Sequence, residues 1–175
     1  PSYFVLDVIN IAIKEGVLPV VAMGNTGSNC IFYPAAYPGV IAVGSTNGKD
    51  EVSTFSTRGE HISLVAPGES IVSVGTLSSD SYIVSHGTSM ASPFVAGAIA
   101  YLMSFNSELT PFQIKTILED TADKIDGEEE FNIKRGYGRV NVYKAAKLAK
   151  TNNVVNNKFF NGRIEISIPP SLKMS

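Results

Sequence analysis

Ser89 lies in a segment that suits a nucleophile, His86-Gly-Thr-Ser-Met-Ala-Ser-Pro93. A serine hydroxyl attacks a carbonyl group only when a base removes its proton and a donor stabilises the charge on the substrate oxygen. An alanine-rich helix is predicted over residues 88–104, which places Ser89 in its first turn. Backbone N–H groups there have no partner within the helix, and the helix dipole favours negative charge. The Ser89 N–H is therefore a candidate oxyanion donor, although Thr88 and Ser89 could also simply cap the helix.

Asn25 is a second candidate donor. The apolar run from Val17 to Met23 is typical of a buried strand, and it ends at Gly24-Asn-Thr-Gly27. A side-chain amide at this point can donate to an oxyanion, but asparagine also tolerates the left-handed conformation of an ordinary turn. The segment has neither the dinucleotide fingerprint nor the lysine of a phosphate loop. We therefore discard a nucleotide-binding domain.

Together these motifs resemble those of the subtilisin-like serine proteases, the subtilase family. Gly87 to Pro93, followed by Val95-Ala-Gly97, is similar to the nucleophile signature of the family. Met23-Gly24-Asn25 looks like its Ala-Gly-Asn motif and stands in the family's order, 64 residues before Ser89. The resemblance implies that Ser89 forms an acyl-enzyme and that Asn25 completes the oxyanion hole. The chain departs from the family at Phe94, where histidine is usual, and we interpret this as a packing difference.

The resemblance extends to residues 33–44, which are similar to the family's segment from the specificity pocket into the next strand. It implies a substrate site that includes Met23, Gly24, Phe32, Tyr33 and Thr88. Phe32 stands where many relatives have a small residue, and no acidic residue is near it. We therefore predict a preference for small or medium apolar side chains before the scissile bond. The alternative is that Phe32 turns into the core, as aromatic residues often do.

The same segment implies a structural feature and an ion. Tyr33-Pro34 is expected to be a cis peptide, and the backbone carbonyls of Ala35, Tyr37 and Val40 correspond to a weak calcium or sodium site in the family. No cofactor is expected for catalysis.

The aspartate and histidine of the family's triad precede the helix that is predicted at the start of this chain. The chain has two histidines, His61 and His86, and neither lies in the family's histidine motif. His86 is close to Ser89 in sequence, but no carboxylate is evident to orient its ring, so we interpret both histidines as structural. Without the base, turnover falls about a millionfold, the value that subtilisin itself gives. We expect the chain alone to be inactive, with Asp and His supplied from outside it; the alternative is a pseudoprotease that acts as a binding or regulatory module.

The hydrophobic pattern predicts an α/β fold. Helical spacing places Phe4, Val8, Ile11 and Ala12 on one face of a first helix. Strands are predicted over residues 17–23, 40–44, 62–67 and 81–85. Helices are predicted over residues 88–104 and 140–149. Another helix is predicted to start at Thr110-Pro111 and to carry an apolar stripe of Ile114, Ile117 and Leu118. The small residues of the 88–104 helix predict close packing on every side. The resemblance implies a three-layer subtilisin-like fold, with a parallel sheet between helices and only its C-terminal part in this chain.

Residues 1–150 form the predicted peptidase domain. Residues 151–175 are expected to be a linker and the start of a further β-rich module, since Arg163-Ile-Glu-Ile-Ser-Ile168 alternates. The first residues, Pro1-Ser-Tyr-Phe4, resemble neither an initiator nor a leader, which suggests a processed piece. The predicted strands would have open edges without the N-terminal half, so the chain by itself is expected to aggregate.

Composition limits the partners. The chain has 14 basic and 16 acidic residues, a formal charge of -2, and no long run of one sign, which argues against nucleic acid and anionic membranes. No apolar stretch approaches the length of a membrane span. Cys30 is the single cysteine, so an internal disulfide is excluded. We expect a protein or peptide substrate, the N-terminal half of the domain and, by resemblance, a propeptide; the resemblance favours secretion or the cell envelope.

Overall fold

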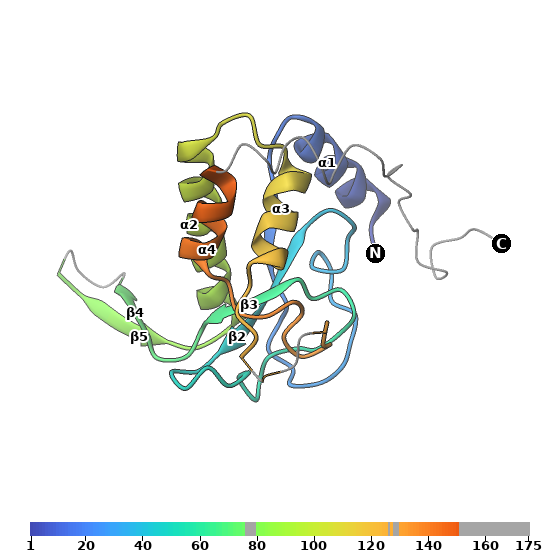
Figure 1. The fold of residues 1–175 in the computed structure, drawn as a ribbon. Coiled ribbons are helices and arrows are strands. Elements are labelled where there is room, and N and C mark those ends of the chain that lie inside the picture. Colours follow the sequence, from blue (N-terminus) through green and yellow to red (C-terminus); the bar gives the residue numbers. More distant parts are fainter. Residues whose placement is uncertain (76–79, 126, 128–129, 151–175) are drawn as a thin grey trace.

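The computed structural model describes residues 1–75, 80–125, 127 and 130–150 of the 175-residue chain (Figure 1). The predicted linker and β-rich module at 151–175 lie outside the described residues. The elements follow in the order α1 (Tyr3–Lys14), β1 (Val20–Ala22), β2 (Ile41–Thr46), β3 (Leu64–Pro67), β4 (Ile71–Val74), β5 (Tyr82–Ser85), α2 (Thr88–Phe105), α3 (Pro111–Asp120) and α4 (Val142–Lys150). The predicted α/β fold is confirmed, and β4 is the element that the pattern did not predict.

The central sheet is parallel, with the strand order β1-β2-β3. Val20 pairs with Ile41, and Val43 pairs with Leu64. β1 is shorter than the predicted run of residues 17–23, and it begins just after Pro19, whose carbonyl accepts the Ile41 N–H at 2.9 Å. Proline has no N–H to donate, which fits its place at the edge of the ladder. The carboxyl ends of these strands carry the loops that contain Gly24 and Gly68.

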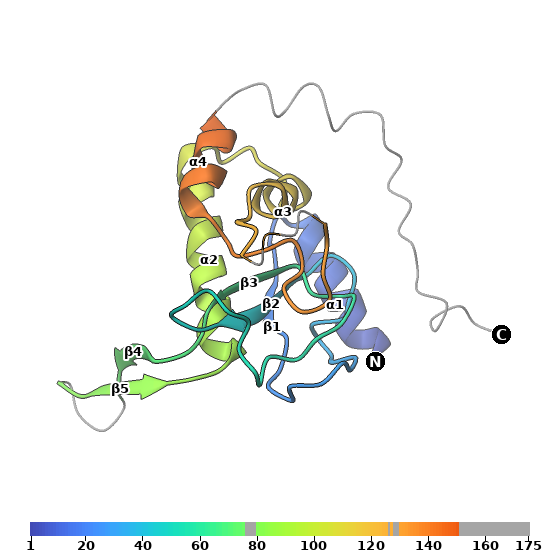
Figure 2. The ribbon, with the colours of Figure 1, turned by 60° about the horizontal axis from the view of Figure 1, so that its bottom comes forward.

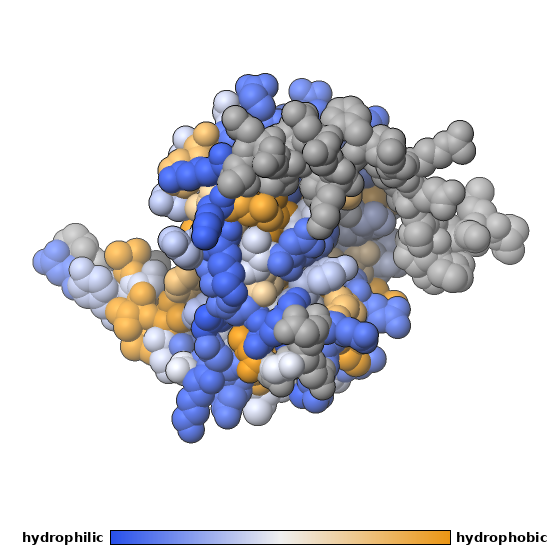
Figure 3. All heavy atoms as spheres, in the orientation of Figure 1, coloured by the Kyte–Doolittle hydropathy of each residue, from blue (hydrophilic) through white to orange (hydrophobic). Residues whose placement is uncertain are grey.

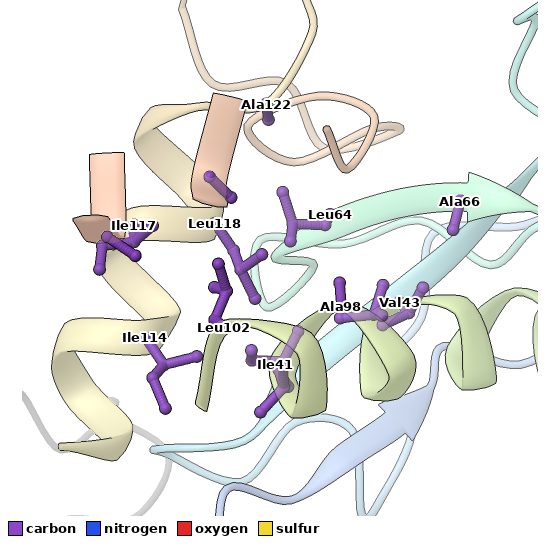
Figure 4. Close-up of a cluster of buried hydrophobic side chains, with 14 of the residues drawn as sticks. Ile41, Val43, Leu64, Ala66, Ala98, Leu102, Ile114, Ile117, Leu118 and Ala122 are labelled. Atoms are coloured by element: carbon purple, nitrogen blue, oxygen red, sulfur yellow. The ribbon is translucent and has the colours of Figure 1, made fainter. Parts of the chain in front are cut away.

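Helices cover both faces of this sheet. Ile41 and Val43 of β2 point toward α2, where Ala98 and Leu102 are buried against them (Figure 4). The small side chains of α2 allow its backbone to approach the strands closely. The predicted stripe Ile114, Ile117 and Leu118 of α3 completes this layer. On the opposite face, α1 packs through Ile9 against Tyr37 and Val40.

The first helix presents its predicted apolar stripe outward rather than inward. Phe4, Val8 and Ile11 are 77%, 49% and 59% exposed, whereas Ile9 is buried and Ile13 packs against the same cluster. The sequence pattern predicted the helix correctly but not the face that packs against the rest of the chain. A helix that is apolar on both faces is normally covered from both sides.

The nucleophile-bearing helix is also open on one face. Val95 and Leu102 are fully buried, but Phe94 and Tyr101 are nearly half exposed, and the space beside Gly97 is empty within 4 Å. The prediction of close packing on every side is therefore wrong for this chain by itself. With 18 residues and a mean hydropathy of 1.3, α2 has the length and composition of a membrane span, a test that buried core helices also pass. Its packing against all three strands is that of a core helix.

Strands β4 and β5 form an antiparallel hairpin that projects from the body (Figures 1 and 2). The register pairs Val72 with Val84 and Val74 with Tyr82, which puts these four exposed side chains on one face. The hairpin is the hydrophobic region that extends to the left in Figure 3. β5 leads directly into the turn that carries Ser89.

Candidate active site

Ser89 lies at the start of α2 and is exposed. The chain reaches it through Gly87, which has φ +148° and whose N–H donates to the Gly68 carbonyl at 2.8 Å. A Cβ atom at Gly87 would lie 3.1 Å from the Nδ2 atom of Asn25. Both the backbone conformation and this close approach therefore favour glycine before the nucleophile turn. The site brings together Asn25 and Ser89 from the ends of two segments far apart in sequence.

The carboxamide of Asn25 is oriented by Thr88. Its Oδ1 atom accepts the Thr88 N–H at 2.9 Å and the Thr88 hydroxyl at 3.0 Å. The same hydroxyl oxygen accepts the Gly24 N–H at 3.1 Å. Because the oxygen of the amide is held in this way, Nδ2 is the group left to donate on the side of the Ser89 turn. Asn25 does not adopt the left-handed conformation that the alternative of an ordinary turn invoked.

Phe32 lies across Gly24. A Cβ atom at Gly24 would lie 3.5 Å from Cγ of Phe32 and 3.1 Å from the Thr57 hydroxyl. Phe32 is 44% exposed, so it does not turn into the core. The ring thus stands over the backbone next to Asn25, where the predicted pocket begins.

Two other predicted pocket residues turn their side chains away. Met23 has no exposed surface and packs with Ala42 and Val65 in the core below the site. The Tyr33 ring packs on Tyr37 with a centroid distance of 4.7 Å. Successive residues of an extended segment point to opposite sides, so Met23 and Tyr33 face the core while Gly24 and Phe32 face outward.

Among the described residues, the hydrogen bonds of His86 and Ser89 join them to other partners and not to each other. His86 accepts the Ser70 N–H through Nδ1 at 3.1 Å, which ties it to the start of the hairpin. His61 is half-buried, and desolvation lowers its pKa. These environments agree with the interpretation of both as structural residues.

The segment after the pocket contains the expected cis peptide at Tyr33-Pro34. Of the three carbonyls assigned to a weak cation site, Ala35 and Tyr37 belong to buried residues, but the Val40 oxygen accepts a hydrogen bond from Lys115 at 2.8 Å. An ammonium group on this oxygen repels a metal ion, so the residues present do not fit the site that the resemblance implies. The sequence reasoning missed Lys115, and its spacing of four residues from Glu119 was the available signal.

The arrangement as a whole suits acyl transfer. Ser89 stands at a helix N-terminus, where its own amide is free of a helical partner, and the Asn25 amide lies beside it. Two such donors can hold the oxygen of a tetrahedral intermediate. An α/β fold with this constellation is typical of serine hydrolases that work by acyl transfer.

Comparison with known proteins identifies the family. Residues 4–139 match the model of the Subtilase family, and the chain belongs to this family. It is similar to the thermophilic serine proteinase of Bacillus sp. (strain AK1), at 42% identity over 79% of this chain and 33% of that protein. It is also similar to thermitase of Thermoactinomyces vulgaris, at 41% identity over 79% of this chain and 47% of thermitase.

Solved structures agree in fold. A protease of Pseudoalteromonas arctica superposes with a TM-score of 0.78 at 30% identity, covering 85% of this chain and 47% of that one. The self-cleaved protease domain of PatA gives a TM-score of 0.75 at 28% identity, covering 86% of this chain and 56% of that one. This chain spans 33% to 52% of the length of curated relatives that it matches.

Proposed function

We propose that this chain is the nucleophile-bearing part of a serine endopeptidase of the subtilisin type. The observation that carries the proposal is the fixed carboxamide of Asn25. Two hydrogen bonds from Thr88 hold its oxygen, so its N–H group is preorganised beside the Ser89 turn before any substrate arrives.

In the proposed reaction the Ser89 oxygen attacks the carbonyl carbon of the scissile peptide, and a histidine from outside this chain takes the hydroxyl proton. The carbonyl oxygen becomes negatively charged and accepts hydrogen bonds from Asn25 and the Ser89 amide. When the C–N bond breaks, the histidine returns the proton to the leaving amine. Water then hydrolyses the acyl-enzyme by the same proton route in reverse.

The missing groups are proposed to come from an N-terminal part of the same protease domain. Three features leave room for it: the exposed stripe of α1 at Phe4, the open face of α2 at Gly97, and the edge of β1, with which no strand of the described residues pairs. Apolar surfaces of this kind mark association sites. A propeptide and export from the cytoplasm are further proposals, supported by the resemblance alone.

Phe32 supports the proposed substrate preference. Because its ring covers Gly24, the pocket before the scissile bond is shallow and suits small or medium apolar side chains. A substrate lysine or arginine before the scissile bond would find no carboxylate among the described residues that line the predicted pocket.

A fluorophosphonate probe tests the proposal, because it labels only an activated serine. The assembled protease should be labelled and the Ser89→Ala variant should not, while the chain of residues 1–175 alone should remain unlabelled. A folded assembly that binds peptides but resists labelling would instead favour the pseudoprotease. Labelling of the isolated chain would show that His61 or His86 supplies the base and would overturn the proposed division of the triad.

A further inference from the structure

We infer that the ammonium group of Lys115 takes the place of the structural cation, so that this protease carries a built-in cation at the amino ends of β2 and β3. The inference concerns stability and lies apart from the catalytic proposal. The residues that carry it are Lys115, Glu119, Val40 and Ser63.

The ammonium group has three oxygen neighbours. Nζ of Lys115 donates to the Val40 carbonyl at 2.8 Å and to the Ser63 hydroxyl at 2.9 Å, and it lies 3.4 Å from Oε1 of Glu119. A lysine ammonium has three N–H groups and accepts nothing, so these neighbours saturate it. Carbonyl, hydroxyl and carboxylate oxygens are also the ligands that hard metal cations prefer. The same donor set therefore serves an ammonium group here and could serve a metal ion without it.

The site is enclosed. Val40 and Ser63 are 3% and 2% exposed, and the side chains of Lys115 and Glu119 are 26% and 14% exposed. Val40 immediately precedes β2 and Ser63 immediately precedes β3, so the ammonium group links the beginnings of two adjacent parallel strands to α3. An ion at this position would make the same link.

Charge balance points the same way. Burial raises the pKa of the Glu119 carboxyl, and the attraction of Lys115, together with hydrogen bonds from Lys115 and Ser63, opposes that rise. Removing the ammonium group alone would leave the largely buried Glu119 carboxylate without its cation and would take the Lys115 hydrogen bond from the Val40 carbonyl. Such a cluster is costly unless a proton or a cation enters it.

The hydrogen bond from Lys115 also explains why the Val40 carbonyl does not fit the metal site that the resemblance implies. The resemblance assigns this carbonyl to a metal, yet the oxygen is already bonded to a positive charge. A lysine is covalently attached and cannot be removed by a chelator. The strand junction should therefore keep its positive charge at any calcium or salt concentration.

The experiment compares thermal unfolding of the assembled protease in a Ser89→Ala background, with and without a chelator and during titration with CaCl2 or KCl. Other cation sites in the assembly contribute equally to every variant, so the difference between variants is the measured quantity. Lys115→Met should lower Tm by about 5 °C in chelator, and added cation should recover at least half of the loss. Lys115→Met with Glu119→Gln should show no recovery beyond that of the parent. Lys147→Met on the exposed face of α4 controls for the loss of one lysine.

Two results would overturn the inference. One is a Lys115→Met variant whose cation response equals that of the parent. The other is a metal ion on the Val40 carbonyl of the parent protein, detected by anomalous scattering from crystals soaked in RbCl or CaCl2. The crystallographic arm decides the question even if Lys115→Met does not fold.

Discussion

Replacing Phe32 with glycine should deepen the specificity pocket and shift cleavage toward large apolar residues. The ring lies over Gly24, with Cγ 3.5 Å from the position of a Cβ atom there, so its removal opens the floor next to the oxyanion amide. Fully burying a phenylalanine side chain is worth about 1.5–3 kcal/mol. If about half of that is gained by a substrate ring, the ratio of kcat/KM for Phe over Ala substrates should rise about 3- to 12-fold. The cost in folding should be small because Phe32 is 44% exposed.

The assay measures kcat/KM for tetrapeptide p-nitroanilides that differ only in the residue before the scissile bond, with Ala, Leu, Phe and Lys in turn. Phe131→Gly is a matched control, since this ring is 40% exposed and lies in the 130–135 loop. The control should leave the Phe-to-Ala ratio unchanged. An unchanged ratio in Phe32→Gly, or best cleavage after Lys by the parent enzyme, would refute the role assigned to Phe32.

Three further predictions concern the oxyanion donor, the pH dependence of stability and the base. Asn25→Ala should lower kcat about 10²–10³-fold, the range that subtilisin itself gives, and an unaltered kcat would remove Asn25 from the oxyanion hole. The same variant should lower the urea midpoint modestly, by about 1 kcal/mol of stability, because the buried Thr88 loses the acceptor for its N–H and hydroxyl groups. Burial raises the pKa of Asp123, but hydrogen bonds from Lys144, Arg139 and Asn141 outweigh it and lower the pKa to about 2 from 3.8. A depressed carboxyl pKa adds stability above pH 3.8, and this stability is lost as the pH falls from about 4 to 2. Asp123→Asn should therefore cost about 1 kcal/mol at pH 7, after allowance for solvent screening. Its urea midpoint should also change less than that of the parent between about pH 4 and 2. His86→Asn keeps an acceptor for the Ser70 N–H and should keep kcat within about tenfold of the parent value. A loss of about 10²–10⁴-fold in kcat would instead identify His86 as the base.

Much of the fold follows from local patterns. Residues 40–44 are a continuous apolar run and residues 62–67 are apolar except at Ser63, and both contribute a strand to the buried parallel sheet. Thr110 is the N-cap of α3, as its Thr-Pro start predicts, and the structure adds a reciprocal capping box with Gln113. β4 was missed because Ile71-Val-Ser-Val74 is short and is stabilised by pairing with β5.

Local sequence patterns did not predict which face of each helix packs against the sheet. The periodicity of α1 is equally consistent with either apolar face turning inward, and only packing against Tyr37 and Val40 selects Ile9 over Phe4. Likewise, the small residues of α2 permit close packing on all sides, but the described chain leaves the face with Phe94 and Gly97 open.

The sequence by itself identified Ser89 and Asn25 as the candidate nucleophile and oxyanion donor, because their motifs follow one another in the order of the subtilase family. Only the tertiary structure decided how these groups are held. Thr88 fixes the Asn25 oxygen across 63 residues of sequence, and Lys115 reaches Val40 across 75. Contacts at such separation depend on which strands and helices are neighbours, and local sequence patterns carry no information about that.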